Sequence, residues 1–257
     1  MRKLVPAPTN TLEDAGPYIT LGMCYASNPE TSESDVTIHR MCLQSRDEIS
    51  IFLQPGARHI GYFRELAEAA GKPLPISISI GVDPAIEIAA CFEPPTTPLG
   101  YEELQAAGAI RKAPVELVKC LTINEKAIAN AEYVIEGEIL PSVRVQEDQN
   151  SHTGKAMPEF PGYCGPANPS LPIIKVKAVT TRFQADRDLI PIPGVQCHPL
   201  DPSNQPEYAP GIRARGVACK AIFDCTVPFD QKDRFERARF MDLDPAHWLP
   251  ELFADVR

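Results

Sequence analysis

The sequence predicts a β-rich α+β fold with a barrel-like arrangement of strands. Short runs in which apolar and polar residues alternate recur through the first 180 residues, a pattern typical of strands with one buried face. Only one or two segments have helical periodicity, and the 27 prolines separate short elements instead of forming one low-complexity tract. Many short strands with few helices are typical of α+β domains. A chain of 257 residues can form one large domain or two modest ones.

Three strands are expected early in the chain, after an extended, proline-rich lead-in. They are predicted at residues 18–26, 36–43 and 48–53. In the second of them the alternation places Val36, Ile38 and Arg40 on one face. An arginine in line with two apolar residues either marks a functional site or is an edge-strand side chain whose charged end reaches water.

Helices and a further strand follow. Residues 60–70 have the periodicity of an amphipathic helix that Gly71 would close, and residues 74–80 (LPISISI) alternate strictly, as a strand does. Asp83 is predicted to cap a short helix.

Two polar residues lie at predicted helix N-termini. His59 precedes the first helix, where backbone N–H groups favour an anion such as phosphate, although a lone histidine there is more often a plain turn residue. Glu103 lies in the first turn of a helix predicted at 102–110, where a carboxylate is usually only a partner of the helix dipole.

A long polar loop, residues 144–165, lies between strands predicted at 133–140 and 171–179. A loop of this length is uncommon unless it is functional or disordered. Its chemically interesting residues are Glu147, Asp148, His152 and Glu159. The loop is either a solvated acidic connection or brings Glu147 and Glu159 together for proton transfer. A metal hydrolase site on Asp148, His152 and Glu159 is disfavoured, because the loop lacks an HExxH-like spacing.

The composition disfavours several classes of function. A net charge of −9 and a pI of about 5.1, without a basic cluster, give no reason to expect nucleic-acid binding. No apolar run is long enough to span a membrane and no signal-peptide core is found at the N-terminus, so a cytoplasmic protein is expected. The eight cysteines have neither zinc-site nor disulfide spacing and are expected to be mostly buried, reduced thiols.

After residue 180 the pattern changes. Residues 190–210 are dense in proline, and residues 235–257 are predicted to form an arginine-rich helical tail. This part has too few apolar residues for a core of its own, so it is expected to wrap the first part or a neighbouring subunit.

Several motifs, found in order along nearly the whole chain, resemble those of the UbiD family of decarboxylases. They are DVTIHRM (35–41), RHI (58–60), GVDPAIEIAACFEPPTTPLGYEEL (81–104), AGAIRKAPVELVKC (107–120), AEYVIEGEILP (131–141) and EFPGYCG (159–165). The loop EDQNSHTGKAMPEF is similar to that of the branch acting on hydroxyarylic acids such as protocatechuate, 4-hydroxybenzoate and gallate. The resemblance implies prenylated FMN, a divalent ion such as Mn²⁺, and a monovalent ion, K⁺ or Na⁺. It also implies a split β-barrel, prenyl-FMN-binding domain at 1–180, followed at 181–257 by a remnant of a C-terminal domain with an extended and helical tail.

The resemblance assigns roles position by position. The metal ligands would be Asp35, His59 and Glu103. The cofactor-binding residues would be these three together with Thr37, Ile38, Arg40 and Arg58. The catalytic residues would be Arg40, Glu147 and Glu159.

The implied reaction is the non-oxidative decarboxylation of a small hydroxylated aromatic acid, resembling protocatechuate, to a phenol and CO2. Loss of CO2 leaves a charge in the ring plane that the ring's π-system cannot spread, so the cofactor serves as the electron sink. Arg40 would orient the carboxylate, Glu159 would protonate the ring carbon, and Glu147 would tune the network. A flavin prenyltransferase would supply the cofactor, and a homo-oligomer is expected.

The chain is shorter than the family members it resembles. It corresponds to a start after their N-terminal domain, and a second block is missing where KVKAVT runs into TRFQAD at residues 180–181. That block is most of the C-terminal domain, which in the family helps to close the active site. The alternative function is therefore a non-catalytic cofactor-binding or assembly module.

Overall fold

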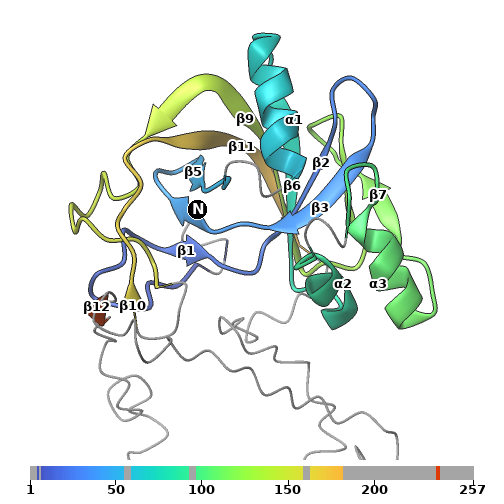
Figure 1. Ribbon diagram of the computed structural model, residues 1–257, viewed down its shortest axis with the longest axis horizontal. Helices are drawn as coiled ribbons and strands as arrows, with labels where there is room; N and C mark the ends of the chain where they lie inside the picture. The colour runs from blue at the N-terminus through green and yellow to red at the C-terminus, as the bar shows by residue number, and fades with distance from the viewer. Residues whose placement is uncertain are drawn as a thin grey trace, which may run out of the picture.

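The computed structural model describes residue 5, residues 7–54, 59–92, 97–158 and 163–181, and the backbone of 236–237. Eight strands form one curved antiparallel sheet in the order β1-β4-β5-β11-β9-β6-β2-β3 (Figure 1). They are β1 Tyr18–Ile19, β2 Met23–Ser27, β3 Ser34–Ile38, β4 Met41–Leu43, β5 Glu48–Ile51, β6 Leu74–Ile80, β9 Tyr133–Val145 and β11 Leu171–Thr181. The helices are α1 His59–Ala69, α2 Pro84–Ala89 and α3 Glu103–Arg111. Two small sheets pair β7 Leu117–Lys119 with β8 Lys126–Ile128, and β10 Tyr163–Cys164 with β12 Glu236–Arg237. The predicted β-rich α+β class is confirmed.

A long hairpin at residues 18–43 connects the two edges of the large sheet. Near its open end β1 pairs with β4, with Tyr18 opposite Cys42, whereas near its turn β2 pairs with β3, with Cys24 opposite Thr37. Between these halves residues 20–22 of one arm face only two residues of the other, so the register shifts by one. Because an extra residue bends and twists a strand pair, one hairpin reaches both edges and curls the sheet into a barrel-like shape.

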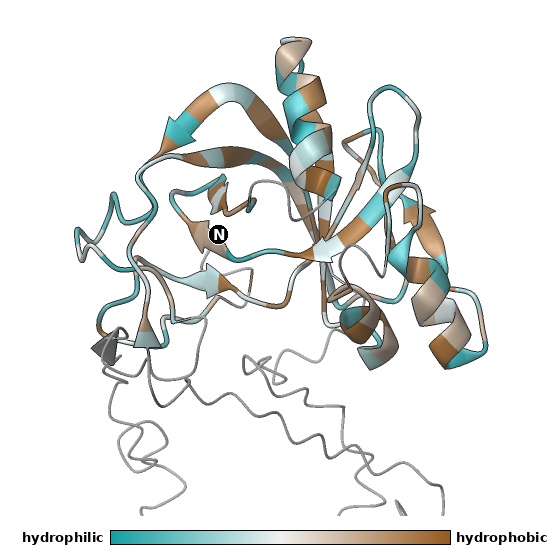
Figure 2. Ribbon diagram, in the orientation of Figure 1, coloured by the Kyte–Doolittle hydropathy of each residue, from teal (hydrophilic) through white to brown (hydrophobic). Residues whose placement is uncertain are grey.

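The two faces of the sheet pack against different helices. Along β2, Cys24 and Ala26 belong to the larger core, which includes α1, whereas Met23 and Tyr25 belong to a second core with α2 and α3. This period-2 separation is the one that the alternating sequence predicts. Figure 2 shows brown hydrophobic residues interspersed with teal and white ones along β9. The edge strand β3 is contacted by both α1 and α3.

Several predicted elements are confirmed closely. The strand at 74–80 is β6. Asp83 caps α2, where its Oδ1 accepts a hydrogen bond from the Ala85 N–H at 2.9 Å. Gly71 follows α1 with a φ of 65°, as a glycine that closes a helix does.

The two strands predicted for the arms of the hairpin are each interrupted. The strand predicted at 36–43 consists of β3 and β4, which are separated by His39 and Arg40. The strand predicted at 18–26 consists of β1 and β2. Arg40 is thus a residue of the bend, and the mid-strand position predicted for it is wrong.

β9 is longer than the strand predicted at 133–140. It extends to Val145, because its pairing with β11 resumes beyond an irregularity that contains Pro141 and Ser142. Proline inside a strand normally indicates an edge, a bulge or a strand end. The predicted loop therefore begins only after Val145.

The start of the tail also differs from its prediction. The helix expected at 235–257 has strand β12 near its beginning, paired with β10, and the rest of that tail lies outside the described residues. Among the described cysteines, which are all free, Cys24, Cys42 and Cys120 are buried, whereas Cys91 is exposed and Cys164 is half-buried. In the part of the chain that the structure describes, no helix combines the length and apolarity needed to cross a bilayer.

The bend of the hairpin depends on Gly22. A Cβ at this position would lie 2.6 Å from Ile78, 2.8 Å from Met41 and 2.9 Å from Ile19, so it would meet side chains on three sides. Because overpacking a core typically costs about 1–3 kcal/mol, Gly22→Ala is expected to lower the free energy of unfolding by that amount in urea denaturation. Gly165, whose Cβ would meet nothing within 4 Å, is the control. Equal stability of Gly22→Ala and Gly165→Ala would contradict this account of the bend.

Candidate functional site

Arg40 and Glu147, 107 residues apart in the sequence, meet at the bend of the hairpin. Arg40 Nε donates to Glu147 Oε1 at 2.9 Å and Nη2 donates to Oε2 at 3.0 Å. The Glu147 side chain is fully buried and that of Arg40 is 11% exposed. A two-point contact of this kind fixes the orientation of both groups. Because a buried ion pair adds little net stability compared with apolar packing, its presence favours a functional role over a structural one.

Further contacts hold this pair in one geometry. The Tyr18 hydroxyl donates to Glu147 Oε1 at 3.0 Å, and the Asn168 N–H donates to Oε2 at 2.9 Å. The Glu147 carboxylate therefore receives two hydrogen bonds at each oxygen. Arg40 also lies over the ring of Phe52, with Cζ 4.2 Å from the ring centroid, a cation–π contact.

The loop that begins with Glu147 is anchored to the turn between β4 and β5. Gln44 Nε2 donates to the Glu147 carbonyl at 2.8 Å, and Asn150 Nδ2 donates to the Gln44 carbonyl at 2.8 Å. Gln149 Nε2 also donates to Gln44 Oε1 at 3.0 Å. The start of the loop is therefore held in place by the sheet. The hypothesis that the loop is only a solvated acidic connection does not fit Glu147, which is buried.

Asp148 stabilises the same loop through hydrogen bonds to other residues of the loop. Its Oδ2 accepts the Gly154 N–H at 2.7 Å and its Oδ1 accepts from Gln146 Nε2 at 2.7 Å. Burial acts to raise the pKa of Asp148, but these hydrogen bonds outweigh it and lower the pKa. The Asp148 carboxylate thus stabilises the conformation of the loop. This role argues against the metal hydrolase site on Asp148, His152 and Glu159, in which Asp148 would be a metal ligand.

A second cluster brings together Asp35 of β3, His59 of α1 and Glu103 of α3. One ligand atom of each residue lies within 4.8 Å of those of the other two, and His59 Nδ1 is 3.3 Å from Asp35 Oδ1. Since β3 is an edge strand contacted by both α1 and α3, one position on it can meet side chains from both helices. In the described residues this is the one group of three or more potential ligands that could hold a metal ion.

The electrostatics of this cluster fit a divalent cation. Burial raises the pKa of Glu103 to about 8, assisted by its hydrogen bond to Asp35 and the negative charge of that residue. Among the described residues, the buried atoms His59 Nε2 and Glu103 Oε2 have no hydrogen-bond partner. A cation would satisfy such atoms and reverse the repulsion between the carboxylates. Two carboxylates and an imidazole suit Mn²⁺ and similar ions.

One short segment of chain carries residues of both clusters. At about 3.3 Å per residue, Asp35 and Arg40 are at most about 17 Å apart along the segment. Thr37 and Ile38 lie between them on β3, and the Thr37 hydroxyl is 2.8 Å from His39 Nε2. A ligand of the candidate metal site and the arginine of the buried pair are therefore carried by the same short stretch of chain.

Two of the predicted site residues, Arg58 and Glu159, lie outside the described residues. Conversely, the contacts of Tyr18, Gln44 and Phe52 with the Arg40–Glu147 pair were not predicted from the sequence. Their positions in the chain carry no signal of a role at a site, and Asn168 contacts Glu147 only through its backbone N–H and carbonyl, which carry no signal in the sequence.

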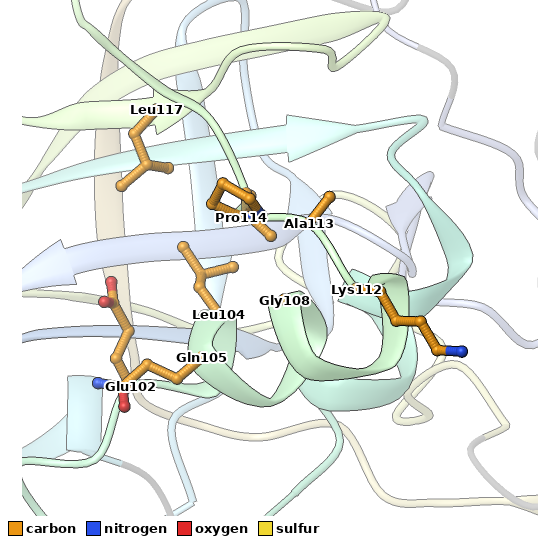
Figure 3. Close-up of a pocket in the computed structure, with 9 residues that line it drawn as sticks. Glu102, Leu104, Gln105, Gly108, Lys112, Ala113, Pro114 and Leu117 are labelled. Atoms are coloured by element: carbon orange, nitrogen blue, oxygen red, sulfur yellow. The ribbon is translucent and has the colours of Figure 1, made fainter.

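A surface cavity of about 440 Å³ lies elsewhere, between α3 and the chain that follows it (Figure 3). Leu104, Pro114 and Leu117 line it, and the Lys112 side chain extends away from them. Because no set of charged groups converges on it, this cavity does not compete with the two clusters as the candidate site.

Comparison with known proteins identifies the family of this chain. The family model of the 3-octaprenyl-4-hydroxybenzoate carboxy-lyase (UbiD) Rift-related domain matches residues 1–187, and the model of the C-terminal domain of these carboxy-lyases matches residues 175–225. The gallate decarboxylase of Lactiplantibacillus plantarum is 42% identical over 357 aligned positions, which include 96% of this chain and 72% of the relative. That alignment is 100 positions longer than the 257 residues present here, so at least 100 residues of the relative have no counterpart.

Solved structures of related enzymes also resemble this chain. The apo 3,4-dihydroxybenzoic acid decarboxylase of Klebsiella pneumoniae is 44% identical, with a TM-score of 0.68 over 98% of this chain and 74% of that chain. An evolved dimeric UbiD-class enzyme of Pelotomaculum thermopropionicum in complex with prFMN is 40% identical, with a TM-score of 0.63 over 72% of this chain and 40% of that chain. The likeness therefore extends over nearly the whole chain in the first of these structures and over about three quarters of it in the second.

Proposed function

Because the chain belongs to the UbiD family of carboxy-lyases, we propose that it decarboxylates a hydroxylated aromatic acid of the protocatechuate class to the phenol and CO2. Decarboxylation of such an acid is the reaction named for its gallate and 3,4-dihydroxybenzoic acid relatives. The observation that carries the proposal is the buried two-point contact between Arg40 and Glu147, on the same segment as the candidate metal ligand Asp35.

The proposed cofactor is prenylated FMN with a divalent ion such as Mn²⁺. Asp35, His59 and Glu103 would hold the ion, which would neutralise the phosphate of the flavin; Thr37, Ile38 and Arg58 would contact the flavin itself. The unpartnered atoms of His59 and Glu103 support the metal. When bound, the prenylated flavin supplies an electrophilic carbon that takes up the electron pair released on loss of CO2. A monovalent ion, K⁺ or Na⁺, belongs to the same proposal.

The residues of this chain would bind the substrate and move one proton. Arg40 would orient the substrate carboxylate through the part of its guanidinium that does not bond to Glu147. Glu147, with its four hydrogen bonds, would keep Arg40 in that position. Glu159 would give its proton to the ring carbon that lost CO2, acting as the general acid.

The experiment is to reconstitute the purified chain with prenylated FMN and Mn²⁺ and to measure CO2 release from protocatechuate, 4-hydroxybenzoate and gallate. Release from at least one of these acids is expected, together with loss of turnover in Glu159→Gln, which cannot donate a proton as an acid. Turnover at the wild-type rate in Glu159→Gln would refute the assignment of the proton donor. No CO2 release from any of the three acids would contradict the proposed reaction.

A non-catalytic module is the second candidate. At least 100 residues of the gallate decarboxylase have no counterpart in this chain, and the module hypothesis would assign closure of the site to them. It predicts that the chain binds flavin and metal but releases no CO2 unless a second chain supplies the absent part.

A further inference from the structure

Tyr18 is a buried residue of β1 that touches the Arg40–Glu147 pair. It is fully inaccessible to solvent, and its hydroxyl donates to Glu147 Oε1 at 3.0 Å across 129 residues of sequence. A buried tyrosine hydroxyl needs a hydrogen-bond partner, but any carbonyl group would serve. Here the partner is the carboxylate that holds Arg40.

Tyr18 also contacts the far end of the loop that Glu147 begins. Met157 packs against the small cluster formed by Ala15, Tyr18 and Cys42. Tyr18 therefore bonds through its hydroxyl to residue 147 at one end of the loop, and the cluster that contains its ring packs against residue 157 at the other end. Met157 is two positions before Glu159, the proposed proton donor.

The hydroxyl keeps its proton throughout the ordinary pH range. Burial raises the pKa of Tyr18 far above its usual value, with further contributions from the nearby Cys42 and Glu147. Tyr18 is accordingly a neutral, permanent donor to Glu147. Of the four hydrogen bonds that this carboxylate accepts, the one from Tyr18 is the only one given by an uncharged side chain among the described residues.

We propose that Tyr18 is a positioning residue that clamps both ends of the 147–157 loop and, through Glu147, sets the position of Arg40. This inference rests on the proposed function for its catalytic consequence, but its structural part does not. The structural part states that the Tyr18 hydroxyl restrains the loop. The catalytic part states that this restraint is needed for turnover and much less for binding.

Tyr18→Phe removes the hydroxyl and keeps the ring. The matched control is Tyr25→Phe, since Tyr25 is also buried in the large sheet but belongs to the core that contains residues of α2 and α3. Hydrogen–deuterium exchange of the cofactor-free proteins is compared for peptides that cover 147–157 and, as a reference, α1. Loss of a hydrogen bond to a carboxylate is expected to make exchange in the loop about tenfold faster in Tyr18→Phe, with α1 unchanged and the loop unchanged in Tyr25→Phe.

Kinetics of the reconstituted proteins test the catalytic part. Tyr18→Phe is expected to lower kcat about tenfold with a KM within about threefold of wild type, because a displaced Arg40 still binds the carboxylate but no longer orients it for reaction. Unchanged exchange in the loop would overturn the clamp, whether or not the chain is an enzyme. Faster exchange with a normal kcat would reduce Tyr18 to a structural residue. A wild-type protein that binds cofactor but releases no CO2 would refute the proposed function and leave the exchange experiment to decide on the clamp.

Discussion

Replacing Arg40 with lysine is expected to lower kcat/KM for the aromatic acid about a hundredfold without unfolding the protein. Lysine keeps the positive charge but has no planar fork, so it cannot bond both oxygens of Glu147 as Arg40 does through Nε and Nη2. A displacement of roughly 1 Å at a reacting group can cost about two orders of magnitude in rate. Steady-state kinetics of the reconstituted variant measure the effect.

The control for this change is Arg111→Lys. Arg111 also pairs with a carboxylate, that of Asp83 at 2.9 Å, but on the surface, where such pairs contribute little. It is expected to leave kcat/KM and the unfolding transition unchanged. If Arg40→Lys retained the wild-type kcat/KM, the two-point contact with Glu147 would have no part in catalysis.

Replacing Glu103 with glutamine is expected to reduce the affinity for Mn²⁺ by at least about a hundredfold. Loss of a group that merely orients a metal ligand costs 10- to 100-fold, and Glu103 would be a ligand itself. The control is the variant Glu102→Gln. Glu102 precedes Glu103 in the sequence, lies outside the cluster and accepts a hydrogen bond from Ser34. Calorimetry with Mn²⁺ alone measures both variants. Equal affinities of the two variants would show that Glu103 is not a ligand of the ion.

The same glutamate predicts how pH affects the metal-free protein. Its folded-state pKa of about 8 lies above the ordinary 4.5, so the folded state holds this proton more tightly than the unfolded state does. The corresponding stability is fully present below about pH 4.5 and is lost as pH rises towards 8. Glutamine mimics the protonated form. Metal-free Glu103→Gln is therefore expected to unfold at a higher temperature than wild type at pH 8, and a lower one would contradict this.

Metal binding should show the opposite dependence on pH. Because a ligand carboxylate must lose its proton, the affinity of the wild type for Mn²⁺ is expected to rise between pH 6 and pH 8, with release of protons. The calorimetric heat should then vary with the ionisation enthalpy of the buffer. A heat that is independent of the buffer would show that no proton is displaced from Glu103.

The fold was predictable where alternation alone decides the structure, as in β6, and less so where the chain bends. At the hairpin bend strand-like residues resume directly after His39 and Arg40, so the sequence pattern does not reveal that the register shifts by one residue there. In β9, Pro141 resembles a strand end, but pairing with β11 resumes beyond it. The uninterrupted hairpin strands and the strand end at residue 140 were both predicted wrongly. In each case one strand has extra residues that pair with no residue of its partner strand.

The site was predictable to a different extent for each cluster. Arg40 was conspicuous from its own surroundings, because a charge in line with Val36 and Ile38 needs a buried partner or water. The grouping of Asp35, His59 and Glu103 came from resemblance alone, since no spacing in the sequence shows that two helices meet one edge strand. Tyr18 gave no signal, because an aromatic residue at the start of a strand is ordinary.

The most direct test of the proposed cofactor site is to purify the chain after co-expression with a flavin prenyltransferase and to determine its bound metal and flavin by elemental analysis and mass spectrometry. We expect one divalent ion and one prenylated FMN per chain, both lost in Glu103→Gln and retained in Glu102→Gln. A colourless, metal-free wild-type protein would contradict the claim that the described domain carries a working cofactor site.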